Sequence, residues 1–163
     1  MFILEYIVKE LEEGYRMAEV RPRGESLGPV FRADAKAEGQ EVVVGGWECR
    51  GGTPARRARW FSVRLTRATA PWAFGRGEPF QNIAAIELFA SLVSVITFGD
   101  EWRKGVKGTL HISGLTDNSG NTSALARLMS SKFPLIVILT EFAAQLRSRG
   151  MDLELEWIPR NQK

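Results

Sequence analysis

Short hydrophobic segments, separated by turn residues, fill the part of the chain between residues 30 and 66. The segment 30–37 ends at the turn sequence EGQ, and an apolar run with two glycines follows at 41–49. In 59–66 hydrophobic and polar side chains alternate with a period of two, which is typical of a strand with one buried face. Short connections between three successive strands predict an antiparallel meander.

A longer apolar segment at 82–98 lacks glycine and proline and is apolar on nearly every side, which predicts a helix buried against a sheet. A strand, two helices and a final, strictly alternating strand follow. Pro134 suits the first turn of the second helix and Gly150 its C-terminal cap. These four elements are expected at 108–115, 122–131, 134–150 and 151–158. Helices between the later strands allow crossover connections, so we predict an α/β fold with a mixed five-stranded sheet and helices packed on it.

The first residues, MFILEYIVKELEEGYRM, predict a short helix, and RPRGESLGP after them is typical of a linker. We therefore divide the chain into a leader helix and linker at 1–28 and a folded domain at 29–163. Composition is that of a globular protein, with 44% apolar and 25% charged residues. The only cysteine, Cys49, and the only histidine, His111, exclude an internal disulfide and a typical zinc site. We expect an intracellular protein, cytoplasmic or nuclear, without a membrane segment.

Positive charge is concentrated in one region, although the net charge of the whole chain is only +3. Residues 50 to 77 contain no acid and interleave their basic side chains with aromatic ones such as Trp60 and Phe61. The arginines of this block are Arg50, Arg56, Arg57, Arg59, Arg64, Arg67 and Arg76. Such a block suits a nucleic-acid backbone, and an arginine-rich solvated surface is the alternative.

Three acids stand where solvation alone explains them poorly. Asp34 lies inside a predicted strand, Glu87 is the only charge in the apolar helix, and Asp117 follows the fourth strand. Each has an ordinary explanation: a solvated strand face, a polar stripe shared with Ser91 and Ser94, and a helix cap or turn. If the first and fourth strands are neighbours, however, the three carboxylates meet. Their mutual repulsion then favours a divalent cation, and oxygen ligands favour Mg²⁺ or Mn²⁺.

Four segments resemble the ribonuclease H domain of retroelement reverse transcriptases. RADAKAEG resembles the first-strand segment, IAAIELFA the first helix, GLTDNSGN the end of the fourth strand and LELEWIPRNQK the end of the fifth. The resemblance covers residues 30 to 163 and implies a ribonuclease H-like fold. It also implies that Asp34, Glu87 and Asp117 are catalytic residues and ligands of Mg²⁺ or Mn²⁺.

The activity implied is cleavage of the RNA strand of RNA–DNA hybrids, with a polymerase region of the same polyprotein as partner and 1–28 as its tail. Asn118 is expected to contact substrate or orient a ligand, and Arg56, Arg57, Arg59 and Arg64 to contact phosphates. The family has a fourth acid just beyond the PR segment, and this sequence ends at Lys163 without one. We therefore expect a weak or inactive nuclease.

Three alternatives remain open. The first is a catalytically inactive binding or connection module of the same fold. The second is another nuclease or strand-transfer enzyme on that fold. The third is a generic α/β domain whose acids all lie on the surface.

Overall fold

A computed structural model describes residues 8, 12, 26–51, 54–75 and 77–159 of the chain. The leader helix and linker predicted for residues 1–28 lie almost entirely outside these ranges, as do the last four residues of the sequence.

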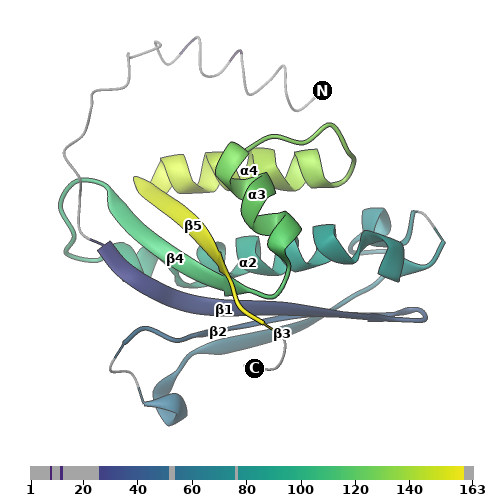
Figure 1. Cartoon of the computed structure of the whole chain (residues 1–163), viewed down its shortest axis with the longest axis horizontal. Coiled ribbons are helices and arrows are strands. Elements are labelled where there is room, and N and C mark those ends of the chain that lie inside the picture. The colour runs from purple at the N-terminus through teal and green to yellow at the C-terminus, as the bar shows by residue number, and fades with distance from the viewer. Residues whose placement is uncertain (1–7, 9–11, 13–25, 52–53, 76, 160–163) are drawn as a thin grey trace.

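Within the described residues, five strands form one mixed sheet in the spatial order β3-β2-β1-β4-β5 (Figure 1). Strands β1, β2 and β3 pair antiparallel, whereas β4 pairs parallel with both β1 and β5. The predicted meander, the crossovers and the mixed sheet are therefore confirmed. The strands are β1 (Ser26–Glu38), β2 (Glu41–Glu48), β3 (Trp60–Leu65), β4 (Leu110–Thr116) and β5 (Met151–Trp157).

Helices cover one face of this sheet, where α2 packs on β1 and β2 and also against α4 (Figure 1). In the part of the chain that the structure describes, three 3₁₀ turns precede α2, one of them between β2 and β3. The helical elements are η1 (Ala55–Arg57), η2 (Pro71–Phe74), η3 (Pro79–Asn82), α2 (Ile83–Arg103), α3 (Ser119–Arg127) and α4 (Leu135–Arg149). Gly150, in the left-handed region at φ 60°, ends α4 as predicted.

Helix α2 extends beyond the predicted end at residue 98, because a side chain one turn further on belongs to the core. Trp102 is 1% exposed and stacks on Phe31 of β1, with ring centroids 5.6 Å apart. That packing outweighs the polar character of the segment from Gly99 to Glu101, which led us to predict the end of the helix at residue 98. Gly114 of β4 is the cross-strand partner of Phe31, and a Cβ added to it would lie 2.2 Å from that ring.

The segment Pro79–Arg103 is long and apolar enough to cross a membrane, with a mean hydropathy of 1.7 over its most apolar window. In the fold, however, 67% of that window is buried inside the protein. A central helix covered by the sheet on one side and α4 on another must be apolar nearly all round. The burial therefore accounts for the composition of α2 without a membrane.

The predicted boundaries differ from the structure at two further elements. Strand β1 begins at Ser26, four residues before the expected start, and pairs there with His111 of β4. Helix α3 begins at Ser119, three residues early, because Asn118 caps it, and it ends before Leu128, which has a positive φ. The second shift matters for the site, since it starts α3 three residues after the end of β4.

Candidate metal centre

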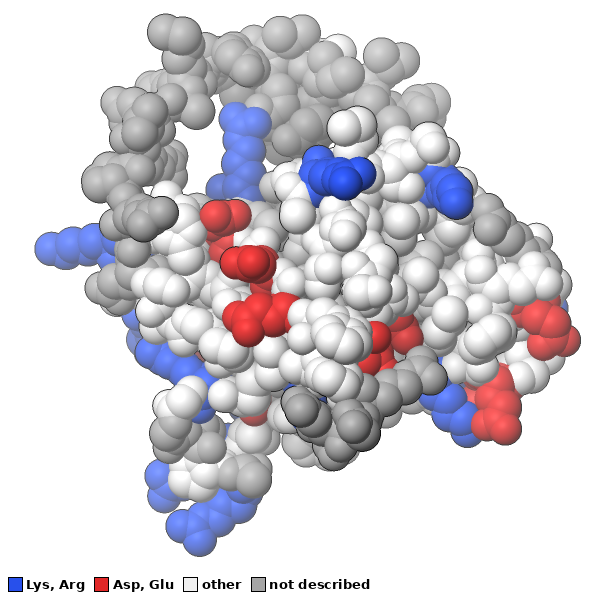
Figure 2. All heavy atoms as spheres, viewed as in Figure 1, with Lys and Arg blue, Asp and Glu red and all other residues white. Residues whose placement is uncertain are grey.

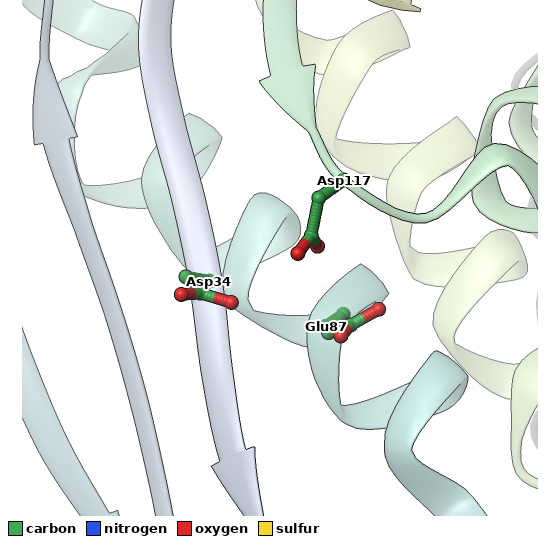
Figure 3. Close-up of side chains that lie close together, drawn as sticks. All are labelled: Asp34, Glu87 and Asp117. Atoms are coloured by element: carbon green, nitrogen blue, oxygen red, sulfur yellow. The ribbon is translucent and has the colours of Figure 1, made fainter. Parts of the chain in front are cut away.

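The three acids singled out in the sequence come together at one place in the fold. Asp34 projects from β1 and Glu87 from α2, and Asp117 is the first residue after β4 (Figure 3). One carboxylate oxygen of each lies within 4.8 Å of the others. The expected convergence is therefore confirmed, while the roles of these residues as metal ligands stay a prediction.

The parallel pairing of β1 with β4 brings the first and third acids together. The pairing ends near Arg32 and Leu115, after which β4 stops at Thr116. Asp34 lies two residues further along β1, and Asp117 lies one residue beyond β4. Both carboxylates therefore reach the same opening at the end of β4, and α2 on the covered face brings its own acid to the same opening.

Glu87 is the most enclosed of the three acids, with 5% of its surface exposed. Asn118 Nδ2 donates a hydrogen bond of 2.7 Å to Glu87 Oε2. The same amide uses its oxygen to cap α3, because Oδ1 accepts from the backbone N–H groups of Gly120 and Asn121 at 3.0 and 3.3 Å. Asn118, rather than Asp117, is thus the helix cap, and its side chain also orients a carboxylate of the cluster.

The loop that carries Asp117 is tied to two other elements. Trp157 Nε1 donates to the carbonyl oxygen of Asp117 at 3.1 Å, and the backbone N–H of Ile158 donates to that of Thr116 at 2.8 Å. Asn121 Nδ2 donates to the carbonyl oxygen of Ala84 in α2 at 2.9 Å. Sequence reasoning missed the role of Trp157, although its place at the end of an alternating strand was the available signal.

The donor set fits a hard divalent cation. All three side chains offer carboxylate oxygens, and no histidine or cysteine belongs to the group. Mg²⁺ keeps several waters and is commonly held by one or two carboxylates, so three acids are enough for one such ion. Three carboxylates at this distance repel one another, and a bound cation would relieve that repulsion. Bringing the three acids together has no benefit for folding alone.

Among the four predicted phosphate contacts, Arg59 stands apart. Its Nε and one terminal nitrogen donate to the two carboxylate oxygens of Glu48, each at 2.6 Å. Its guanidinium lies over the Phe98 ring of α2, 5.2 Å from the centroid, and Trp102 Nε1 donates to Glu48 at 2.7 Å. These contacts place Arg59 on the helix-covered side. The phosphate contact expected of Arg59 stays a prediction, and the structure shows this guanidinium paired with Glu48.

The other three arginines are placed differently. Arg56 and Arg57 are exposed in η1, at the tip of the β2–β3 connection, where Figure 2 shows basic side chains gathered. Arg64 is exposed on β3, opposite Val43, on the sheet face that the helices leave uncovered. Their roles stay predictions, but all three are accessible.

Comparison with solved structures identifies the fold. The chain matches LC11-RNase H1 in complex with an RNA/DNA hybrid, with a TM-score of 0.56 and 13% identity over 81% of this chain and 86% of that chain. It matches the N-terminal RNase H domain of a Mycobacterium tuberculosis protein, with a TM-score of 0.51 and 19% identity over 83% and 89%. RNase H1 from Halobacterium salinarum NRC-1 gives 0.49 and 16% over 85% and 89%. No family model and no curated protein matches the sequence.

The fold is therefore that of ribonuclease H, a mixed five-stranded sheet with helices on it, as predicted. The structural similarity establishes the fold. Because sequence identity to these proteins is below 20%, the activity must be argued from the site.

Replacing Glu48 by Gln tests whether the Arg59 contact is structural. Hydrogen bonding to Arg59 holds the pKa of Glu48 below its ordinary value of 4.5, against the opposing effect of burial. A depressed folded-state pKa contributes stability above the unfolded-state pKa, and that stability is lost as the pH falls through the folded-state pKa. Glu48→Gln should therefore lower the free energy of unfolding by about 1 kcal/mol at pH 7, a modest figure because Arg59 is partly exposed.

Urea denaturation between pH 7 and pH 3 measures this difference, which should shrink as the solution becomes more acidic. Glu38→Gln is the matched control, since its partner Lys36 is an exposed side chain on a hairpin. A Glu48→Gln deficit that is the same at every pH would contradict the ion pair as its source.

Two substitutions of Asn118 separate its cap from its contact with Glu87. Asn118→Ala removes both and should cost about 1 kcal/mol from the cap alone. Asn118→Asp keeps a capping oxygen but sets a fourth carboxylate beside Glu87. Millimolar Mn²⁺ should raise the thermal stability of both variants, because both keep the three acids, and it should recover more of the loss in Asn118→Asp, where an added carboxylate increases the repulsion. Equal responses of the two variants to Mn²⁺ would show that Asn118 does not face a cation site.

Proposed function

We propose that this chain is a metal-dependent endonuclease that cleaves the RNA strand of RNA–DNA hybrids as part of a retroelement reverse transcriptase. The observation that carries the proposal is the convergence of Asp34, Glu87 and Asp117 at the end of β4, on a ribonuclease H fold. Repulsion within such a cluster lowers the stability of the fold, and a bound cation is the best explanation for keeping the three acids together.

The three carboxylates would hold Mg²⁺ or Mn²⁺ beside the scissile phosphate. When bound, such ions supply an activated water and stabilise the leaving oxygen in phosphodiester hydrolysis. The chain's own contribution is placement. β1 and β4 fix two ligands on a rigid sheet, α2 supplies a third from beneath, and Asn118 holds the Glu87 carboxylate in one orientation.

Support for a hybrid substrate comes from three directions. A protein of the same fold has been solved with an RNA/DNA hybrid. The exposed arginines Arg56, Arg57 and Arg64 offer sequence-independent contacts to phosphates. The segment that ends β5 resembles that of retroelement enzymes, and we propose that residues 1–28 are the tail of a polymerase region in the same polyprotein. Recognition of the RNA strand would rest on its 2′-hydroxyl groups.

The number of acids bears on the rate. A two-metal displacement needs more ligands than one Mg²⁺ does, and the described part of the chain groups three acids. Glu156 of β5 is the next acid to consider, yet its side chain is exposed on the strand. We therefore propose a slow nuclease, and a binding module of the same fold is the alternative that an assay must exclude.

A cleavage assay distinguishes these functions. The chain is incubated with RNA–DNA hybrid, duplex DNA and duplex RNA, each with Mg²⁺, with Mn²⁺ and with chelator. We expect cleavage of the hybrid alone, dependent on the metal, and a loss of at least 100-fold in Asp117→Asn, because a metal ligand is removed. Binding of hybrid without cleavage under every condition would favour the binding module, and cleavage of duplex DNA would favour another nuclease.

The arginines are tested by salt dependence. Each phosphate contact contributes roughly one unit to the slope of log binding constant against log salt concentration. The triple variant Arg56→Ala, Arg57→Ala, Arg64→Ala should therefore flatten the slope by about two to three units for hybrid binding. Arg127→Ala, an exposed arginine on α3, is the control and should leave the slope unchanged. An unchanged slope in the triple variant would show that these arginines do not contact phosphates and that the basic block is only a solvated surface.

A further inference from the structure

Two tryptophans on the uncovered face of the sheet have no part in the site described so far. Trp47 of β2 and Trp60 of β3 are direct cross-strand partners. Trp60 is 73% exposed and Trp47 is 39% exposed, although an indole is among the largest apolar side chains. Arg32 of β1, the cross-strand partner of Trp47 on the other side, places its guanidinium 5.8 Å from the Trp47 ring centroid. An Arg-Trp-Trp row therefore crosses the three antiparallel strands.

A groove of about 740 Å³ runs beside this row, and Asp34 of the carboxylate cluster is one of its lining residues. Asp34 and Lys36 border it on β1, and Trp47 and Trp60 border it on β2 and β3. Its floor includes Gly45, which lies opposite Asp34 across the β1–β2 ladder. The groove thus begins at a proposed metal ligand and ends at two exposed aromatic rings.

The two glycines of β2 have different explanations. A Cβ on Gly46 would lie 2.6 Å from Ser94 Oγ and 2.7 Å from the Phe61 ring, so close packing on α2 demands glycine there. At Gly45 the nearest atom to a Cβ would be the Phe61 carbonyl oxygen at 3.4 Å, which is close to ordinary contact. Packing does not require glycine at that position, and its effect is to leave the groove floor bare. A strand glycine of this kind often marks the approach of a ligand.

The chemistry of the groove suits an unpaired nucleotide. Indole faces stack on nucleobases without regard to sequence, and an adjacent arginine adds a cation for the phosphate or the ring. Within a duplex the base faces are covered by their neighbours, so exposed indoles can stack only on a base outside the helix. Arg64, exposed on the same face one row beyond Ser62, would be within reach of the backbone of such a strand.

We propose that this groove is a stacking subsite for one or two unpaired nucleotides that leave the hybrid next to the carboxylate cluster. The proposal rests on the proposed function for the position of the hybrid, and it adds a preference for hybrids that carry a single-stranded extension. Stacking itself needs no metal, so the two ideas can fail separately.

Binding is measured by fluorescence anisotropy in chelator with a blunt hybrid and with the same hybrid carrying a four-nucleotide extension, of RNA or of DNA. For the unmodified chain the extension should tighten binding by roughly 5- to 100-fold, the range of base–aromatic stacking. Trp60→Leu should abolish that gain while leaving the blunt hybrid and the salt slope unchanged. Trp60→Phe should keep most of the gain, because it keeps an aromatic face, and Trp47→Leu should reduce it.

Met129→Ala, at another apolar side chain that is 73% exposed, is the control and should behave as the unmodified chain. An extension that gives no gain, or a gain that survives in Trp60→Leu, overturns the subsite. An equal loss for blunt and extended hybrids in Trp60→Leu overturns it too, because the indole would then contact the duplex. If RNA and DNA extensions tighten binding equally, the base faces are the ligand, because the two extensions differ in their sugars. Cleavage of the blunt hybrid with Mg²⁺ is scored separately and tests only the proposed function.

Discussion

Repulsion among three carboxylates is the constraint around which the rest of this structure is arranged. Asp34, Glu87 and Asp117 hold oxygens within 4.8 Å of one another, and Glu87 is almost fully buried. Burial favours the neutral form of an acid, and nearby acids do so as well, so folding alone gives no reason to collect them. An arrangement that costs stability and still uses three separate elements is typical of a site kept for a ligand rather than for the fold.

The surrounding contacts are those needed to keep such a cluster from relaxing apart. Both polar atoms of the Asn118 amide form hydrogen bonds: its oxygen accepts from the first turn of α3, and its nitrogen donates to Glu87. Trp157 holds the backbone of Asp117 from β5, and Asn121 ties α3 to α2. Each acid is thus fixed by an element whose own position is set elsewhere in the core. Rigid support of this kind lets carboxylates bind a cation without first being reorganised.

The sequence predicted the strands and their order along the chain well, because these depend on local alternation and on general rules for chain crossovers. The convergence of the three acids was predicted from their places on those elements. The sequence predicted poorly wherever a distant partner decides the outcome. Helix α2 continues to Arg103 because Trp102 stacks on Phe31, a contact between residues 71 positions apart. Arg59 was grouped with the basic block, yet it pairs with Glu48 across β2 and β3, where only the strand register brings them together. No pattern in a single sequence reveals such pairs, whereas the alternation of β5 needed no partner to be recognised.

Charge on the uncovered face of the sheet gives the site a direction. The β5 half carries Asp152, Glu154 and Glu156 as exposed side chains, and Figure 2 shows acids along this strand. The β1–β3 half carries charges of both signs: Arg32 on β1 and Arg64 on β3, and Lys36 paired with Glu38 and Glu41. A polyanion is therefore repelled less by this half than by the acidic β5 half, and the difference acts at short range. The carboxylate cluster lies where the two halves meet, at the end of β4. For the proposed substrate, an approach over β1, β2 and β3 is therefore the less repulsive one, and the groove with its exposed indoles lies on that side.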